Sequence, residues 1–175
     1  WMSFNLGLAI ASGGMALGRL PCEAGGVLIL ALEDRPARLR RRFSQILGDE
    51  EKPPNLYMET EWPRENEGGL SVLDSWLGLH SECAMVVIDT LAKFRAMGEE
   101  SGYAQDYQAM EGLQRLAGKH AICIMVITHY RKAQGEDWLE NVTGTFGVAG
   151  GADTIIGLER PRGFAGQANA LLHVT

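Results

Sequence analysis

Three polar residues in this 175-residue chain stand directly after aliphatic runs, or one residue beyond them: Glu33, Asp89 and His129. Such runs are typical of strands buried on both faces of a parallel sheet, and ligands bind beside the carboxyl ends of such strands. Each residue alone has a simpler structural explanation, such as a charge at a helix N-terminus for Glu33 or a hydrogen-bonded loop position for His129. The three together favour one functional site at one edge of a sheet.

Asp89 gives the most specific of these signals. Four apolar residues precede it and Thr90 follows, in the sequence MVVIDT, which is the pattern of a Walker B strand. A carboxylate suits that place because Mg²⁺ prefers hard oxygen ligands, often through its own waters, beside nucleotide phosphates. Glu33 is a candidate base for an attacking water. His129 is a candidate hydrogen-bond partner of the γ-phosphate, able to report its loss to the following loop.

Strands and helices that could position these residues alternate along the chain. Aliphatic runs predict strands, and apolar residues at helical spacing predict helices between them. The predicted strands are 27–32, 56–60, 85–88, 122–127, 154–158 and 170–174, and the predicted helices are 1–12, 35–47, 70–82 and 104–119. The segments 49–69, around its one short strand, and 91–103 are expected to be loops. This order predicts one α/β domain, with a mostly parallel twisted sheet and helices on both faces.

Composition narrows the class of protein. The net charge of −6 argues against a freestanding binder of duplex DNA covered in Lys and Arg. The longest apolar run, 26–32, is far shorter than the roughly 20 residues that cross a bilayer, so no membrane partner is expected. Cys22, Cys83 and Cys123 form no CxxC pair and are expected to be buried free thiols. These features, and the absence of a signal-peptide pattern, predict a cytoplasmic protein.

Several blocks of sequence together resemble a known family. They are VLILALEDRPARLRRRF, MVVIDTLAKFR, DYQAMEGLQRLAGKHAICIMVITHYRK and VTGTFGVAGGADTIIGLER. In this order they resemble the AAA-type P-loop ATPases of the RecA/DnaB superfamily, close to the RepA-type hexameric helicases. The resemblance implies a RecA-like core that binds ATP with Mg²⁺ and assembles into a homo-oligomeric ring, a hexamer, with sites between subunits. It implies Glu33 as catalytic glutamate, Asp89 as the Walker B aspartate beside Thr90, and His129 as a phosphate sensor.

The chain departs from that family at both ends. No G-x-x-x-x-G-K-[ST] phosphate loop (Walker A) is present in the 175 residues; in the family this loop stands immediately before a helix like 1–12. We expect it before Trp1, and an arginine-finger segment after Thr175. The 175 residues are thus expected to be one RecA-like domain truncated at both ends, and inactive alone.

Contacts with DNA or with a neighbouring subunit are expected in two places. Arg131 and Lys132 directly follow His129, and an exposed loop pair is an equally good interpretation. Thr143 and Thr145 lie in the Gly-rich segment 141–151, at the place of a DNA-facing loop in RecA-like proteins; a simple flexible loop is the alternative. The arginines of the helix 35–47 are interpreted as a solvated helix face.

The function predicted from these features is an ATP-dependent motor of DNA replication, a helicase-type ATPase acting on single-stranded DNA. One alternative is a RecA- or KaiC-like ATPase that serves recombination or regulation. The other is a non-hydrolysing nucleotide-sensing assembly protein, in which Glu33 and Asp89 only cap their strands.

Overall fold

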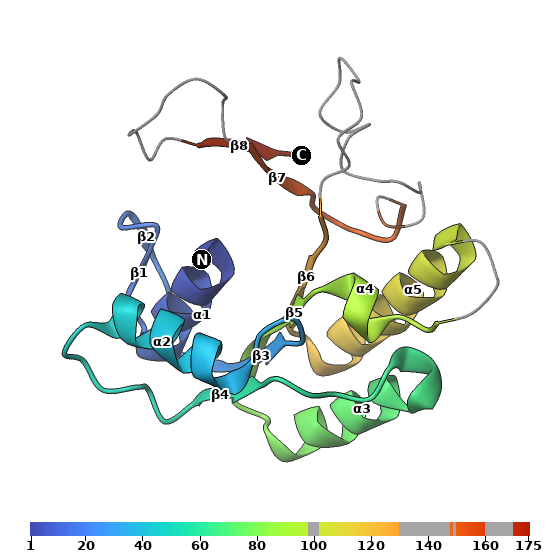
Figure 1. Cartoon of the computed structure of the whole chain (residues 1–175), viewed down its shortest axis with the longest axis horizontal. Helices are drawn as coiled ribbons and strands as arrows, with labels where there is room; N and C mark the ends of the chain where they lie inside the picture. Colours follow the sequence, from blue (N-terminus) through green and yellow to red (C-terminus); the bar gives the residue numbers. More distant parts are fainter. Residues whose placement is uncertain (98–101, 130–147, 149, 160–169) are drawn as a thin grey trace.

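The computed structural model describes the chain except for residues 98–101, 130–147, 149 and 160–169 (Figure 1). Its centre is a four-stranded, fully parallel sheet in the order β4–β3–β5–β6. The strands are β3 (Gly26–Ala31), β4 (Leu56–Glu59), β5 (Cys83–Asp89) and β6 (Cys123–Ile127). The predicted α/β class with a parallel sheet is confirmed.

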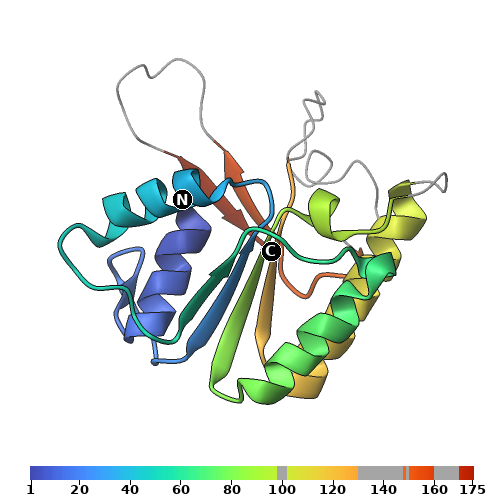
Figure 2. The ribbon, with the colours of Figure 1, turned by 60° about the horizontal axis from the view of Figure 1, so that its bottom comes forward.

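Helices cover both faces of this sheet (Figures 1 and 2). The helices α1 (Met2–Ser12) and α2 (Pro36–Leu47) lie on one face, and α3 (Gly69–Leu79) and α5 (Gly102–His120) lie on the other. Successive strand side chains point to opposite faces, so β3 and β5 need an apolar residue at every position. Packed under α1 and α2 are Val27, Ile29, Met85 and Val87. Packed under α3 and α5 are Leu28, Leu30, Val86 and Ile88.

Short local signals set the helix ends. Gly13 ends α1 with φ 65°, in the left-handed region that glycine adopts without steric cost. Pro36 begins α2, where its missing N–H has no partner to lose. The predicted helix 70–82 is too long, because α3 ends at Leu79 and β5 already begins at Cys83.

Four short elements were not predicted. They are the hairpin strands β1 (Met15–Ala16) and β2 (Leu20–Pro21), the 3₁₀ helix η1 (Glu65–Glu67), and α4 (Leu91–Phe94) within the predicted loop 91–103. Each has two to four residues, which is too few for a hydrophobic period to show. The strands β7 (Ile156–Glu159) and β8 (Leu171–Val174) are present as predicted, but they form a separate antiparallel pair.

The strand β6 lies at an edge of the described sheet and is only partly buried. As a result, the expectation of buried thiols is confirmed for Cys83 and wrong for Cys123, which is exposed; Cys22 is half-buried, and all three thiols are free. Within the described ranges, no helix is long and apolar enough to cross a membrane.

Candidate functional site

The register of the parallel strands gathers the predicted residues at one edge of the sheet. Ala31 pairs with Asp89, and Asp89 pairs with Ile127 on its other side. One residue beyond β3, the Leu32 N–H donates to the Asp89 carbonyl oxygen over 2.7 Å. The structure therefore places Glu33 and His129, each two residues beyond its strand, on either side of the end of β5.

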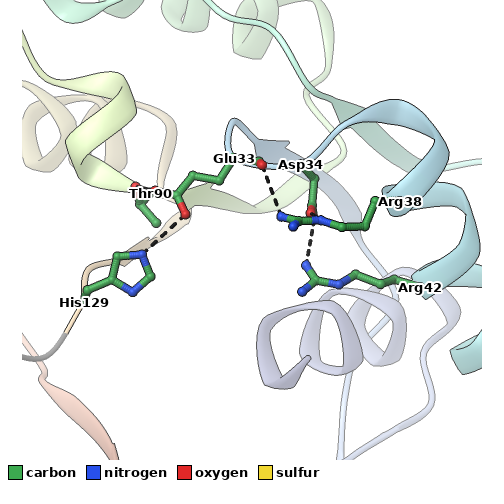
Figure 3. Close-up of polar contacts among 6 residues, drawn as sticks. All are labelled: Glu33, Asp34, Arg38, Arg42, Thr90 and His129. Atoms are coloured by element: carbon green, nitrogen blue, oxygen red, sulfur yellow. Dashed lines mark hydrogen bonds and ion pairs between the residues drawn. The ribbon is translucent and has the colours of Figure 1, made fainter.

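Glu33 is held through both of its carboxylate oxygens (Figure 3). The Thr90 hydroxyl donates to Oε1 over 3.0 Å, and His129 Nε2 lies 3.4 Å from Oε2. Thr90 is fully buried, whereas the His129 side chain is 76% exposed. The contact between Thr90 and Glu33 was not predicted, because 57 residues of sequence separate them. The carboxylate thus has a defined direction while remaining open to solvent on the side of His129.

Asp89 lies in a less favourable electrostatic environment. Its pKa is raised, first by partial burial and then by the neighbouring carboxylates of Glu33 and Asp34. The amino group of Trp1 and the side chain of His129 act in the opposite direction and lower the pKa. A bound cation would stabilise the ionised form of Asp89, and a carboxylate oxygen is the ligand type that Mg²⁺ prefers. The influence of Trp1 also shows that the N-terminal end of α1 faces this edge, as Figure 2 shows.

A second cluster beside Glu33 was missed in the sequence. The carboxylate of Asp34, whose side chain is 3% exposed, accepts hydrogen bonds from Arg38 Nε and, over 2.8 Å, from an Arg42 guanidinium nitrogen. The same Arg38 guanidinium donates to the Glu33 backbone carbonyl over 3.2 Å. The interpretation of these arginines as a solvated face is therefore wrong for Arg38 and Arg42. The spacing of i, i+4 and i+8, which puts the three charges on one helix face, was the available signal.

A basic hollow lies next to α4, close to the same edge of the sheet. It encloses about 420 Å³. The cations that line it are Arg64, Lys93 and Arg95. Arg64 donates to the backbone carbonyls of Ala92, over 3.4 Å, and Arg95, over 2.9 Å, which ties the segment before α3 to α4. The hollow combines positive charge with an accessible concave surface.

The other predicted contact residues lie outside the described residues. They are Arg131, Lys132, Thr143 and Thr145.

A parallel sheet covered by helices on both faces, with carboxylates at the carboxyl ends of its strands, defines the class of RecA-like ATPase domains. In agreement, the fold is similar to that of a solved helicase ATPase domain, with a TM-score of 0.57. The match covers 78% of this chain and 60% of that one at 16% sequence identity, so the similarity is one of fold. The chain thus spans about 60% of the length of that domain.

The chain belongs to the AAA domain family, which matches residues 1–135. Among curated proteins, none matches the chain. The resemblance to AAA-type, RecA-like ATPases is therefore confirmed, and membership of this family implies nucleotide binding.

Proposed function

We propose that this domain is the ATP-hydrolysing motor of a RepA-like, helicase-type protein of DNA replication. The observation that supports this most strongly is the carboxylate of Glu33, held between Thr90 and His129 beside Asp89. A carboxylate with a fixed direction and one open side is suited to orient a water and to accept its proton.

In this mechanism, Glu33 is the base that activates water for in-line attack on the γ-phosphate of ATP. Thr90 donates to one oxygen of Glu33 and so leaves the other free to accept a proton. His129 lies at hydrogen-bonding distance from that other oxygen and is mostly exposed. It can therefore exchange its contact with Glu33 for one with the terminal phosphate, and we propose it as the sensor of that phosphate.

Asp89 would hold Mg²⁺, directly or through a coordinated water. The residues fit this ion, because Asp89 is a carboxylate in an environment that disfavours its own charge. In the described parts of the chain, no group of three His, Cys, Asp or Glu could hold a metal unaided. This agrees with an ion that takes most of its ligands from water and phosphates. Bound Mg²⁺ supplies neutralisation of phosphate charge.

The phosphate loop is proposed to precede Trp1. The supporting observation is that the N-terminal end of α1 faces Asp89, and free N–H groups at a helix N-terminus are suited to bind phosphate. We further propose that the single RecA-like domain extends beyond Thr175 to an arginine-finger segment. Sites of this kind would be completed between subunits of a hexameric ring.

Single-stranded DNA is the proposed polymer on which the ring acts. The basic hollow at Arg64, Lys93 and Arg95 supports this, since it opens near the same edge of the sheet as Glu33. Arg131, Lys132, Thr143 and Thr145 are proposed as further contacts to DNA or to a neighbouring subunit.

The test is Glu33→Gln in the full-length protein. General-base catalysis contributes about 10²–10⁴-fold, so we expect ATP turnover to fall by about 100-fold or more while ATP binding persists. The matched control is Glu23→Gln, an exposed glutamate in the loop before β3. Wild-type turnover in Glu33→Gln would exclude this role for Glu33.

Two further measurements separate the alternatives. ATP binding without turnover in the wild-type protein would identify a non-hydrolysing sensor. Turnover without strand displacement on a forked duplex would identify a regulatory or recombination ATPase.

A further inference from the structure

We propose that Arg38 is a positioning residue for Glu33, and that the buried carboxylate of Asp34 fixes Arg38 in that role. This inference rests on the proposed function of Glu33 as the base. It concerns a group that does not touch ATP and acts through the backbone of the residue that does.

The turn that carries Glu33 is held at its backbone. The Asp34 N–H donates to the Ala31 carbonyl over 3.0 Å, which closes a tight turn between β3 and α2 with Glu33 inside it. The Arg38 guanidinium then donates to the carbonyl of Glu33 itself, over 3.2 Å. This carbonyl is exposed at the end of the turn, and Arg38 is its side-chain donor (Figure 3).

Asp34 supplies the fixed point. A buried carboxylate needs paired cations to offset its desolvation, and Asp34 has two of them, Arg38 and Arg42. The planar guanidinium of Arg38 presents several N–H donors in a rigid fork, so one group bonds Asp34 with Nε and Glu33 with a terminal nitrogen. The backbone of Glu33 is therefore anchored by Arg38, while Thr90 and His129 contact its carboxylate.

The same cluster reaches α1. The guanidinium of Arg42 lies over the ring of Trp1, 5.8 Å from its centre, and Phe4 packs edge-on against Phe43 with 6.2 Å between ring centres. The turn that carries Glu33 is thus joined through α2 to the N-terminal end of α1, which faces Asp89. The base and this end of α1 are held in one rigid arrangement.

This geometry makes Arg38→Ala an informative variant. Asp34 keeps Arg42 as a partner, over 2.8 Å, so that its buried charge is not left alone. What is lost is the donor to the Glu33 carbonyl. The side chain of Arg38 is half exposed, at 50%, so little packing is lost with it.

The experiment measures steady-state ATP hydrolysis by the full-length protein. A displacement of about 1 Å in a catalytic group can cost about 10²-fold in rate, so we expect Arg38→Ala to lower kcat by about 10- to 100-fold. KM for ATP is expected to stay within about twofold of wild type, because binding does not use Glu33. Arg38→Lys is expected to lose kcat as well, since one ammonium cannot reproduce the planar fork. The matched control is Arg41→Ala, an exposed arginine of the same helix, which should retain wild-type kcat.

Single-turnover hydrolysis by the double variant Glu33→Gln/Arg38→Ala then tests the route of the effect. If Arg38 acts through Glu33, adding Arg38→Ala to Glu33→Gln leaves the residual rate unchanged. Full additivity of the two losses, or wild-type kcat in both Arg38 variants, would overturn the inference. Wild-type turnover in Glu33→Gln alone would instead overturn the proposed function, so the two failures are distinguishable.

Discussion

Glu33 and Asp89 are two carboxylates at one edge of the sheet, and their surroundings differ. Glu33 has hydrogen-bonding partners for both of its side-chain oxygens. Asp89 is instead partly buried close to two other carboxylates, and its pKa is raised. Pairs of titratable groups in contrasting environments take different chemical roles. The contrast fits a base at Glu33 and a cation ligand at Asp89.

The raised pKa of Asp89 predicts a pH-dependent gain in stability on Asp89→Asn. A carboxyl group whose pKa is higher in the folded than in the unfolded state weakens folding when it ionises. The penalty is absent below the ordinary Asp pKa of about 3.9 and grows as the pH rises through the raised value. Asp89→Asn should therefore have a higher free energy of unfolding than wild type at about pH 7, and the difference should vanish towards about pH 4.

Urea unfolding of the full-length protein, with chelator present and nucleotide absent, measures this difference. Glu23→Gln serves as the control, because Glu23 is exposed. An Asp89→Asn variant no more stable than wild type near neutral pH would contradict the prediction.

Sequence reasoning found the residues at the strand ends but not the ones that hold them. Glu33, Asp89 and His129 follow aliphatic runs, and strand register does the rest. The bond from Thr90 to Glu33 spans 57 residues and depends on the order of strands in the sheet, which no local pattern contains. Burial of Asp34 likewise depends on α1 packing beside α2, so its pairing with Arg38 and Arg42 was hidden.

At the scale of elements, apolar patterning was sufficient wherever an element is long and buried. All six positions of β3 are buried, and the run 27–32 predicts it to within a residue at each end. The strand β6 has the same aliphatic composition but is half-buried, because it lies at the edge of the described sheet. Composition records how apolar a strand is, whereas its burial is set by its neighbours.

Two glycines of α5 make opposite predictions for helix stability. A methyl group added at Gly118 would meet no atom within 4 Å, whereas one added at Gly112 would lie 2.4 Å from Leu70 Cδ1 of α3. Ala is favoured over Gly in helices by about 0.5–1 kcal/mol, so Gly118→Ala should raise the free energy of unfolding by about 0.5 kcal/mol. Overpacking costs about 1–3 kcal/mol, so Gly112→Ala should lower it by about 1 kcal/mol.

Chemical denaturation of the two variants tests this pair, and each is the control of the other. A gain in stability at both positions would show that Leu70 moves aside freely and that the contact between α3 and α5 is loose.

At the scale of the whole molecule, charge is distributed unevenly. The net charge is −6, yet three cations, Arg64, Lys93 and Arg95, line one hollow near the edge of the sheet that carries Glu33. Arg64 is occupied with backbone carbonyls and Arg95 with Asp106, over 2.6 Å. Within the part of the chain that the structure describes, the exposed ammonium of Lys93 makes no hydrogen bond or ion pair, so it is the cation most available to a phosphate. An acidic protein can thus contact a polyanion through one local surface.

Lys93→Ala is therefore predicted to weaken the binding of single-stranded DNA in a salt-dependent way. Each phosphate neutralised on a single strand contributes about 0.7 to the slope of log affinity against log salt concentration, so the slope should fall by about 0.7 when this one contact is lost. Fluorescence anisotropy of a labelled oligothymidine with the full-length protein, over a range of salt concentrations, gives the slope. Arg115→Ala is the control, because Arg115 is exposed on α5 towards the amino ends of the strands, away from the hollow. An unchanged slope in Lys93→Ala would place the DNA path elsewhere on the molecule, whereas a reduced slope in that variant alone would place it beside α4, at the edge of the sheet where Glu33 and Asp89 lie.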